Sequence, residues 1–95
     1  MRKVTDAEIL DFCRTNPGWG YEDGELIRYF RFKDFAEGMA LFTAAGILQQ
    51  ELGQDARYAL QGTQGSIALR TTNEDGVTDV DLELAHKISA HSRWP

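Results

Sequence analysis

The sequence is poor in the residues on which most enzymes and secreted proteins rely. Its 95 residues include one cysteine, two histidines and two prolines. A single cysteine cannot close an internal disulfide, which suits a reducing compartment, and we expect a cytoplasmic protein. No signal peptide is recognisable, and no apolar run approaches the roughly 20 residues that cross a bilayer. The sequence therefore predicts no membrane partner.

Positive charge is also scarce. Ten Lys and Arg stand against 15 Asp and Glu, which gives a net charge of -5. No basic run is longer than two residues, whereas nucleic-acid binding normally needs a basic patch. No glycine-rich phosphate loop follows a predicted strand. The sequence therefore predicts neither a nucleic-acid partner nor a nucleotide cofactor.

Apolar and aromatic residues, in contrast, are plentiful. Hydrophobic residues make up 42% of the chain and include 5 Phe, 3 Tyr and 2 Trp. This supply is enough for one hydrophobic core in a chain of this length. We expect a single domain over residues 1–95.

The periodicity of the chain predicts three helices and four strands. Thr5 and Glu8 form a capping box at the first helix, and Asp34 and Glu37 form another at the second. Asp23 and Gly24 are suited to a tight hairpin turn. The predicted helices span 4–15, 34–52 and 78–91, and the strands are a short one around 19–21, then 25–32, 56–61 and 66–71, the last two joined by a turn around Gly62 and Gly65. The order α-β-β-α-β-β-α predicts an α+β two-layer sandwich, a four-stranded antiparallel sheet with its helices on one face.

The apolar positions on these elements predict the core. In the central helix, Phe35, Met39 and Phe42 make one stripe at helical spacing, and a second stripe runs from Leu41 to Leu52. The side chains that we expect to be buried are Phe30, Phe32, Phe35, Phe42, Leu48, Leu69, Leu84 and Ile88. Ile27 and Tyr29 point to the other face of their strand, which leaves apolar surface for a second subunit. We therefore expect a homodimer or a higher closed oligomer.

Residues that could carry chemistry are few. His86 and His91 are five apart on a helix, about 140° around its axis, so they do not share a face and do not suggest a metal site. Cys13 lies on an apolar helix face, as a core cysteine does. Asp79, Asp81 and Glu83 resemble the solvated start of a helix. We expect no metal and no cofactor.

Three stretches resemble the pterin-4a-carbinolamine dehydratase family. They are "WGYEDGELIRYFRFKDFAEGMALF", with Phe30-Arg31-Phe32-Lys33-Asp34-Phe35 at its centre, "IALRT", and "GVTDVDLELAHKI". The resemblance extends from about Val4 to Ala90 and implies the sandwich fold predicted above. It also implies an activity, since members of the family dehydrate the 4a-hydroxy-tetrahydropterin that aromatic amino acid hydroxylases release.

The resemblance also implies where the catalytic histidines should stand, and there they are missing. The family places a His-His-Pro signature after the main helix and a Thr-His-Asp stretch after the last strand. Counting back from "IALRT", these positions hold Gln54-Asp55-Ala56 and Thr71-Thr72-Asn73. Gln54 and Thr72 cannot exchange protons near neutral pH, and an exposed carboxylate such as Asp55 is a weak base. The sequence therefore predicts a former active site.

Two functions from different classes remain open. Some members of the family are dimerisation cofactors for a homeodomain transcription factor, and a bacterial branch without the catalytic histidines is linked to Rubisco assembly in α-carboxysome organisms. The resemblance to that branch implies a non-catalytic assembly factor with a Rubisco subunit as its partner. The candidate contact residues are Tyr29, Arg31, Arg57 and Tyr58, because Arg and Tyr are common interface anchors. The alternatives are a divergent dehydratase that uses Asp55 or a group not yet assigned, and, as a third function, a pterin-like ligand binder without turnover.

Overall fold

The computed structural model describes residues 1–91, so the last four residues of the predicted domain lie outside the described residues. The predicted order of elements and the α+β class are confirmed. The elements are α1 (Asp6–Thr15), β1 (Trp19–Glu22), β2 (Glu25–Arg31), α2 (Phe35–Leu52), β3 (Ala56–Gln61), β4 (Gln64–Leu69), a short 3-10 turn η1 (Thr72–Glu74) and α3 (Asp79–His91). Within residues 1–91, no helix is long and apolar enough to cross a membrane.

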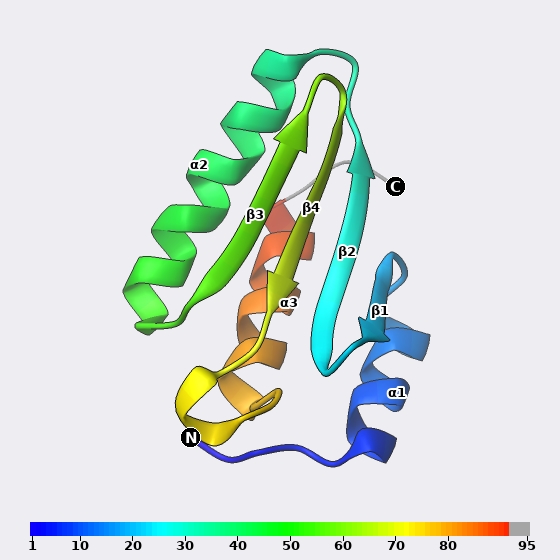
Figure 1. Ribbon diagram of the computed structural model, residues 1–95, viewed down its shortest axis with the longest axis vertical. Helices are drawn as coiled ribbons and strands as arrows, with labels where there is room; N and C mark the ends of the chain where they lie inside the picture. The colour runs from blue at the N-terminus through cyan, green and yellow to red at the C-terminus, as the bar shows by residue number, and fades with distance from the viewer. Residues whose placement is uncertain (92–95) are drawn as a thin grey trace.

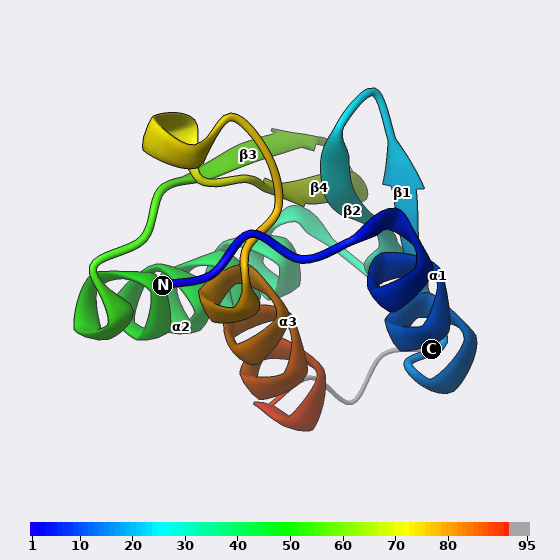
Figure 2. The ribbon, with the colours of Figure 1, turned by 90° about the horizontal axis from the view of Figure 1, so that it is seen from below.

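The strands form one antiparallel sheet in the order β1-β2-β4-β3. The helices α2 and α3 lie on one face of this sheet, with α1 beside β1 at its end, and the other face is open (Figures 1 and 2). The core lies between the sheet and the helices and contains Val4, Ile9, Trp19, Leu26, Phe30, Phe32, Leu41, Ala45, Ile67, Leu69, Val77, Leu84, Ala85 and Ile88. We call the opposite side of the sheet the open face.

The predicted start and turn signals are present, with one difference. Thr5 and Glu8 form the complete capping box of α1. The hairpin between β1 and β2 turns at Asp23 and Gly24, both with positive φ, as a two-residue hairpin requires. At α2, Asp34 accepts from the backbone N–H of Glu37, but the Glu37 carboxylate accepts from Lys33 N, one residue before the cap.

The orientation of α2 on the sheet differs from the prediction, so part of the predicted core is wrong. Phe35 is 52% exposed and Met39 is 47% exposed, so the first of the two predicted stripes points mostly to solvent. The reason is Gly38, where an added Cβ would come within 2.8 Å of Leu60 and 2.9 Å of Phe32. This close approach turns the helix so that Gly38, Leu41 and Ala45 face the sheet. Phe42 and Leu48 are half-buried at the edge of the core, and the other predicted core residues are buried as expected.

Gly65 was expected in a turn but lies inside β4, where it pairs with Phe30 and Leu60. The turn itself is formed by Gly62 and the residue after it, because Gln61 and Gln64 already pair. An added Cβ at Gly65 would come within 2.9 Å of the Phe42 ring. This glycine therefore makes room for an aromatic side chain of α2.

The apolar surface predicted on the open face is smaller than expected. Ile27 is only 7% exposed, because β1 and β4 flank its strand on both sides. Tyr29 is 61% exposed, and its hydroxyl donates to Glu22 Oε1 at 2.9 Å. The other large exposed apolar side chains are Met1, Leu10 on α1, and three on α2, namely Phe35, Met39 and Ile47.

Candidate functional site

The positions at which the resemblance predicts histidines meet at one end of the sheet. Gln54 and Asp55 precede β3, and Thr71 and Thr72 follow β4. Because β3 and β4 are antiparallel neighbours with Ala56 opposite Leu69, these flanking residues lie side by side. They line a hollow of about 180 Å³, together with Met1, Gly53, Asn73 and Glu74. The structure thus brings Gln54, Asp55 and Thr72 together.

Gln54 is not available to a ligand in this hollow, because its side chain is bound within the protein. It is 6% exposed. Its Nε2 donates to Asp81 Oδ1 at 2.7 Å and to Thr71 Oγ1 at 2.9 Å. A buried amide must be satisfied in this way to avoid a desolvation penalty. Gln54 therefore ties the loop before β3 to the first turn of α3.

Asp81 is the centre of this polar cluster, and the prediction that it is solvated was wrong. It is 0% exposed, whereas Asp79 and Glu83 are exposed as expected. Its Oδ2 accepts from Thr71 Oγ1 and from the backbone N–H of Thr78, each at 2.9 Å. The hydroxyls of Thr71 and Thr78 are 2.9 Å apart. The carboxylate turns inward because three chain segments supply it with donors.

The cluster of Gln54, Thr71, Thr78 and Asp81 links three segments of the chain, and all four side chains are buried. Its amide and hydroxyl groups do not titrate near neutral pH, and its carboxylate is enclosed by the protein. Asp55 and Thr72 are exposed. His86 and His91 are exposed on α3 and do not line the hollow.

Three of the four candidate contact residues share the open face. The register places Tyr29 opposite Ser66, Arg31 opposite Gln64, and Arg57 opposite Ala68, and paired residues point to the same side of a sheet. Tyr58 points the other way, into the helix side. Its ring lies 5.3 Å from the Phe42 ring, its hydroxyl donates to Gln49 Oε1 at 2.8 Å, and burial raises its pKa.

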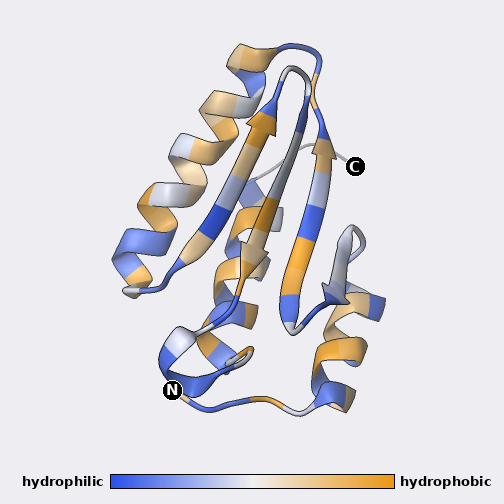
Figure 3. Ribbon diagram, in the orientation of Figure 1, coloured by the Kyte–Doolittle hydropathy of each residue, from blue (hydrophilic) through white to orange (hydrophobic). Residues whose placement is uncertain are grey.

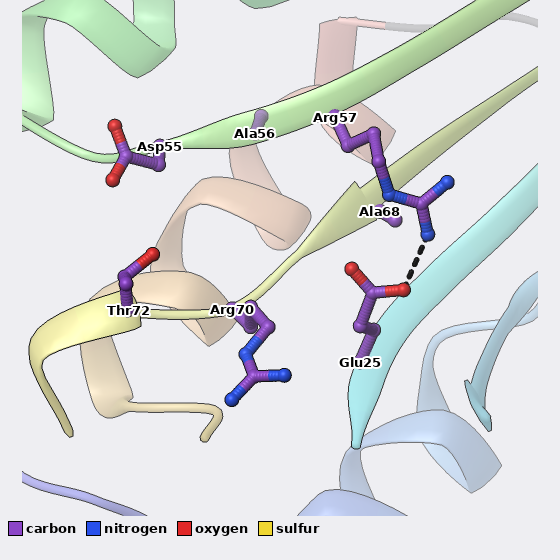
Figure 4. Close-up of a pocket in the computed structure, with 7 residues that line it drawn as sticks. All are labelled: Glu25, Asp55, Ala56, Arg57, Ala68, Arg70 and Thr72. Carbon is purple, nitrogen blue, oxygen red and sulfur yellow. Dashed lines mark hydrogen bonds and ion pairs between the residues drawn. The ribbon is translucent and has the colours of Figure 1, made fainter. Parts of the chain in front are cut away.

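A second hollow, of about 220 Å³, opens on the open face beside the first (Figure 4). Its lining consists of Glu25, Asp55, Ala56, Arg57, Ala68, Arg70 and Thr72. Arg57 forms an ion pair with Glu25, and Arg70 forms one with Asp75. Sequence reasoning missed Glu25 and Arg70. Strand alternation could have found Arg70, since it shares a face with Arg57 on the neighbouring strand.

The fold and this site define a class of protein: a two-layer α+β domain with an open sheet face and a polar end that lacks histidine. The model of the family described as pterin 4 alpha carbinolamine dehydratase matches residues 2–91. The chain belongs to this family.

The chain is also similar to individual members of the family. Proteins of Brucella ovis and Brucella abortus that are named for pterin-4-alpha-carbinolamine dehydratase are each 28% identical to it over 90 residues, with 93% of both chains covered. The crystal structure of a transcriptional coactivator/pterin dehydratase from Brucella melitensis matches with a TM-score of 0.86 and 27% identity. That match covers 93% of this chain and 96% of the other.

Proposed function

We propose that this chain is a non-catalytic member of its family that binds a protein partner. The observation that supports this most is the engagement of Gln54. The resemblance implies an acid-base histidine at position 54. The Gln54 amide that stands there is buried, and it donates one hydrogen bond to Asp81 and one to Thr71. General acid-base catalysis needs a group that titrates near the working pH and can reach the substrate. Gln54 meets neither requirement, so the position serves the fold.

The partner that we propose is an unassembled Rubisco subunit in a bacterium with α-carboxysomes. The support is the likeness to the branch of the family that has lost the same histidines, together with the acidic balance of the chain. A helper of this kind binds an exposed surface on a subunit and leaves as native contacts form, so mass action favours the competent subunit over its aggregates. The open face, with Tyr29, Arg31 and Arg57, is the surface that we assign to this contact. We also propose that the helper acts as a homodimer.

The alternative is a divergent dehydratase, and the position of Asp55 favours it. Asp55 lines both hollows at the end of the sheet, so its carboxylate could meet a small substrate there. A pterin-like ligand held without turnover would use the same space. A dehydratase also needs a second group for proton transfer, and Thr72, the other matching position that lines both hollows, does not titrate near neutral pH.

Co-expression tests the proposed function. Rubisco is produced in a heterologous host with the wild-type chain, with a Tyr29→Ala, Arg31→Ala, Arg57→Ala triple variant, with a His86→Ala control on α3, and alone. We expect the wild type and the control to raise the yield of soluble, active Rubisco, and the triple variant to lose the gain. Equal yields with and without the wild-type chain would reject the Rubisco role. Genomic neighbours offer a cheaper check, since a phenylalanine hydroxylase gene beside this one would favour the dehydratase.

A further inference from the structure

We propose that the hollow between Arg57 and Arg70 binds an acidic side chain, Asp or Glu, presented by the protein partner. This inference rests on the proposed binding function and names the chemistry of its contact. Arg57 stands on the edge strand β3, and Arg70 directly follows β4. Ala68 lies opposite Arg57 and two residues before Arg70 on the same face, and its small side chain leaves the hollow of about 220 Å³ open.

The arrangement of charges already shows how a carboxylate fits. Figure 4 shows the Glu25 carboxylate between the guanidinium groups of Arg57 and Arg70. The dashed line in the figure marks its ion pair with Arg57. A guanidinium group presents several N–H donors in one plane, which match the two oxygens of a carboxylate. Glu25 therefore occupies, from within the chain, a place that a partner's carboxylate can take.

Both arginines can exchange their present partners. In the first pair the Arg57 side chain is 62% exposed and the Glu25 side chain 18%. In the second the Arg70 side chain is 37% exposed and the Asp75 side chain 90%. Because one partner of each pair is largely in contact with solvent, each pair is screened, and an incoming carboxylate can replace the internal one.

The surrounding charges restrict the kind of anion that fits. Glu25 and Asp55 line the same hollow, and the whole chain carries a net charge of -5. A dense polyanion such as RNA would meet repulsion from both carboxylates and from the chain as a whole. A single carboxylate on a protein surface needs only the two guanidinium groups. The attraction must therefore come from Arg57 and Arg70, because the net charge of the chain is negative and repels an anion.

Titration of the isotope-labelled chain with short capped peptides tests this inference. Arginine Hε and backbone amide signals are followed by NMR at low salt with peptides that carry spaced Glu, Gln or Lys residues, and with free succinate. We expect the Glu peptide to shift the signals of Arg57 and Arg70 and to bind more weakly as salt rises. Arg57→Gln or Arg70→Gln should weaken binding by about fivefold. Glu25→Gln, which removes the internal competitor, should strengthen it by about threefold.

The matched control is Arg14→Gln, which removes an exposed, ion-paired arginine on α1, outside both hollows. It should leave the dissociation constant within about twofold of the wild type. Equal weakening by Arg14→Gln, equal binding of the Gln or Lys peptide, or no gain from Glu25→Gln would overturn the inference. Tighter binding of succinate than of the Glu peptide would assign the hollow to a small carboxylate instead. Because the chain is titrated alone, these results are separate from the Rubisco yields.

Discussion

The hydrogen bond between Gln54 and Asp81 is a structural contact between two buried side chains. The amide of Gln54 donates to a carboxylate with no exposed surface. If Asp81 is replaced by alanine, the donors of Gln54, Thr71 and Thr78 lose their acceptor inside the protein. A buried donor left without a partner is costly, and the cost grows when several share one acceptor.

We predict that Asp81→Ala lowers the free energy of unfolding by about 3 kcal/mol. Glu83→Ala, at an exposed position of the same helix, should change it by less than about 0.5 kcal/mol. Urea unfolding followed by circular dichroism measures both. Similar effects of the two substitutions would show that the cluster around Asp81 does not stabilise the fold.

The ionisation of the Glu8 side chain makes the stability of the fold depend on pH. Its carboxylate accepts from Arg2 and from the backbone N–H of Thr5, and mainly the Arg2 contact lowers its pKa from the ordinary 4.5 to about 2. A lowered pKa means that the ionised form stabilises the folded state. This contribution is complete above the unfolded value and is lost as pH falls from 4.5 toward 2. Thermal unfolding of the wild type and of Glu8→Gln should therefore converge in that window. A constant gap between their melting temperatures from pH 6 to pH 2.5 would contradict this.

At the scale of elements, the sequence predicted most of the fold because its signals are local. Capping residues, the Asp23-Gly24 turn and the alternation of strands each act within a few residues. The failures came from contacts between distant segments. Asp81 was placed in solvent because nothing near it in the sequence reveals the donors on Gln54 and Thr71. Phe35 was placed in the core because the close approach at Gly38 depends on the opposite sheet.

The sequence predicted that Gln54, Asp55 and Thr72 belong to one site, because the motifs of the resemblance point to these positions, and all three line one hollow. The sequence could not predict that Gln54 completes a buried cluster, since three separate segments form it. Strand alternation could have predicted that Arg57 and Arg70 share a face of the sheet. Their ion pairs with Glu25 and Asp75 depend on the fold and could not be predicted.

The packing of α2 predicts the effect of a substitution on that element. The Phe42 ring contacts the rings of Phe30, Phe32 and Tyr58, so Phe42→Ala should leave a gap at the edge of the core. We expect a loss of about 3 kcal/mol in the free energy of unfolding, near the low end for buried Phe because Phe42 is only half-buried. Leu10→Ala, at an exposed apolar position on α1, is the control and should be nearly neutral. Native stability of Phe42→Ala in chemical denaturation would refute the assigned packing.

For the whole molecule, the exposed apolar side chains indicate a second copy of the chain on α2. Phe35, Met39 and Ile47 are exposed, no charged residue lies between Glu37 and Glu51, and Figure 3 shows apolar colours along most of this helix. Two antiparallel copies of α2 would bring Phe35 of one copy near Ile47 of the other, with Lys33 near Glu51. Both open faces would remain free for partners.

We therefore predict a dimer with about twice the mass of the 10.7 kDa chain. Met39→Glu should dissociate it, because a charge in an apolar interface is not compensated. Tyr29→Ala, on the open face, is the control. Light scattering at micromolar concentration measures all three. A monomeric wild type would reject the dimer, and dissociation by Tyr29→Ala alone would move the interface to the open face.

The proposal that this chain does not catalyse dehydration concerns the whole molecule and has the most direct test. The purified chain is mixed with a 4a-hydroxy-tetrahydropterin, and dehydration is followed by ultraviolet absorbance beside the spontaneous reaction. Each lost acid-base group typically costs a factor of about 10² to 10⁴ in rate, so we predict a rate equal to the spontaneous one for the wild type and for Asp55→Asn alike. Turnover well above the spontaneous rate that Asp55→Asn abolishes would contradict the non-catalytic function and establish a dehydratase.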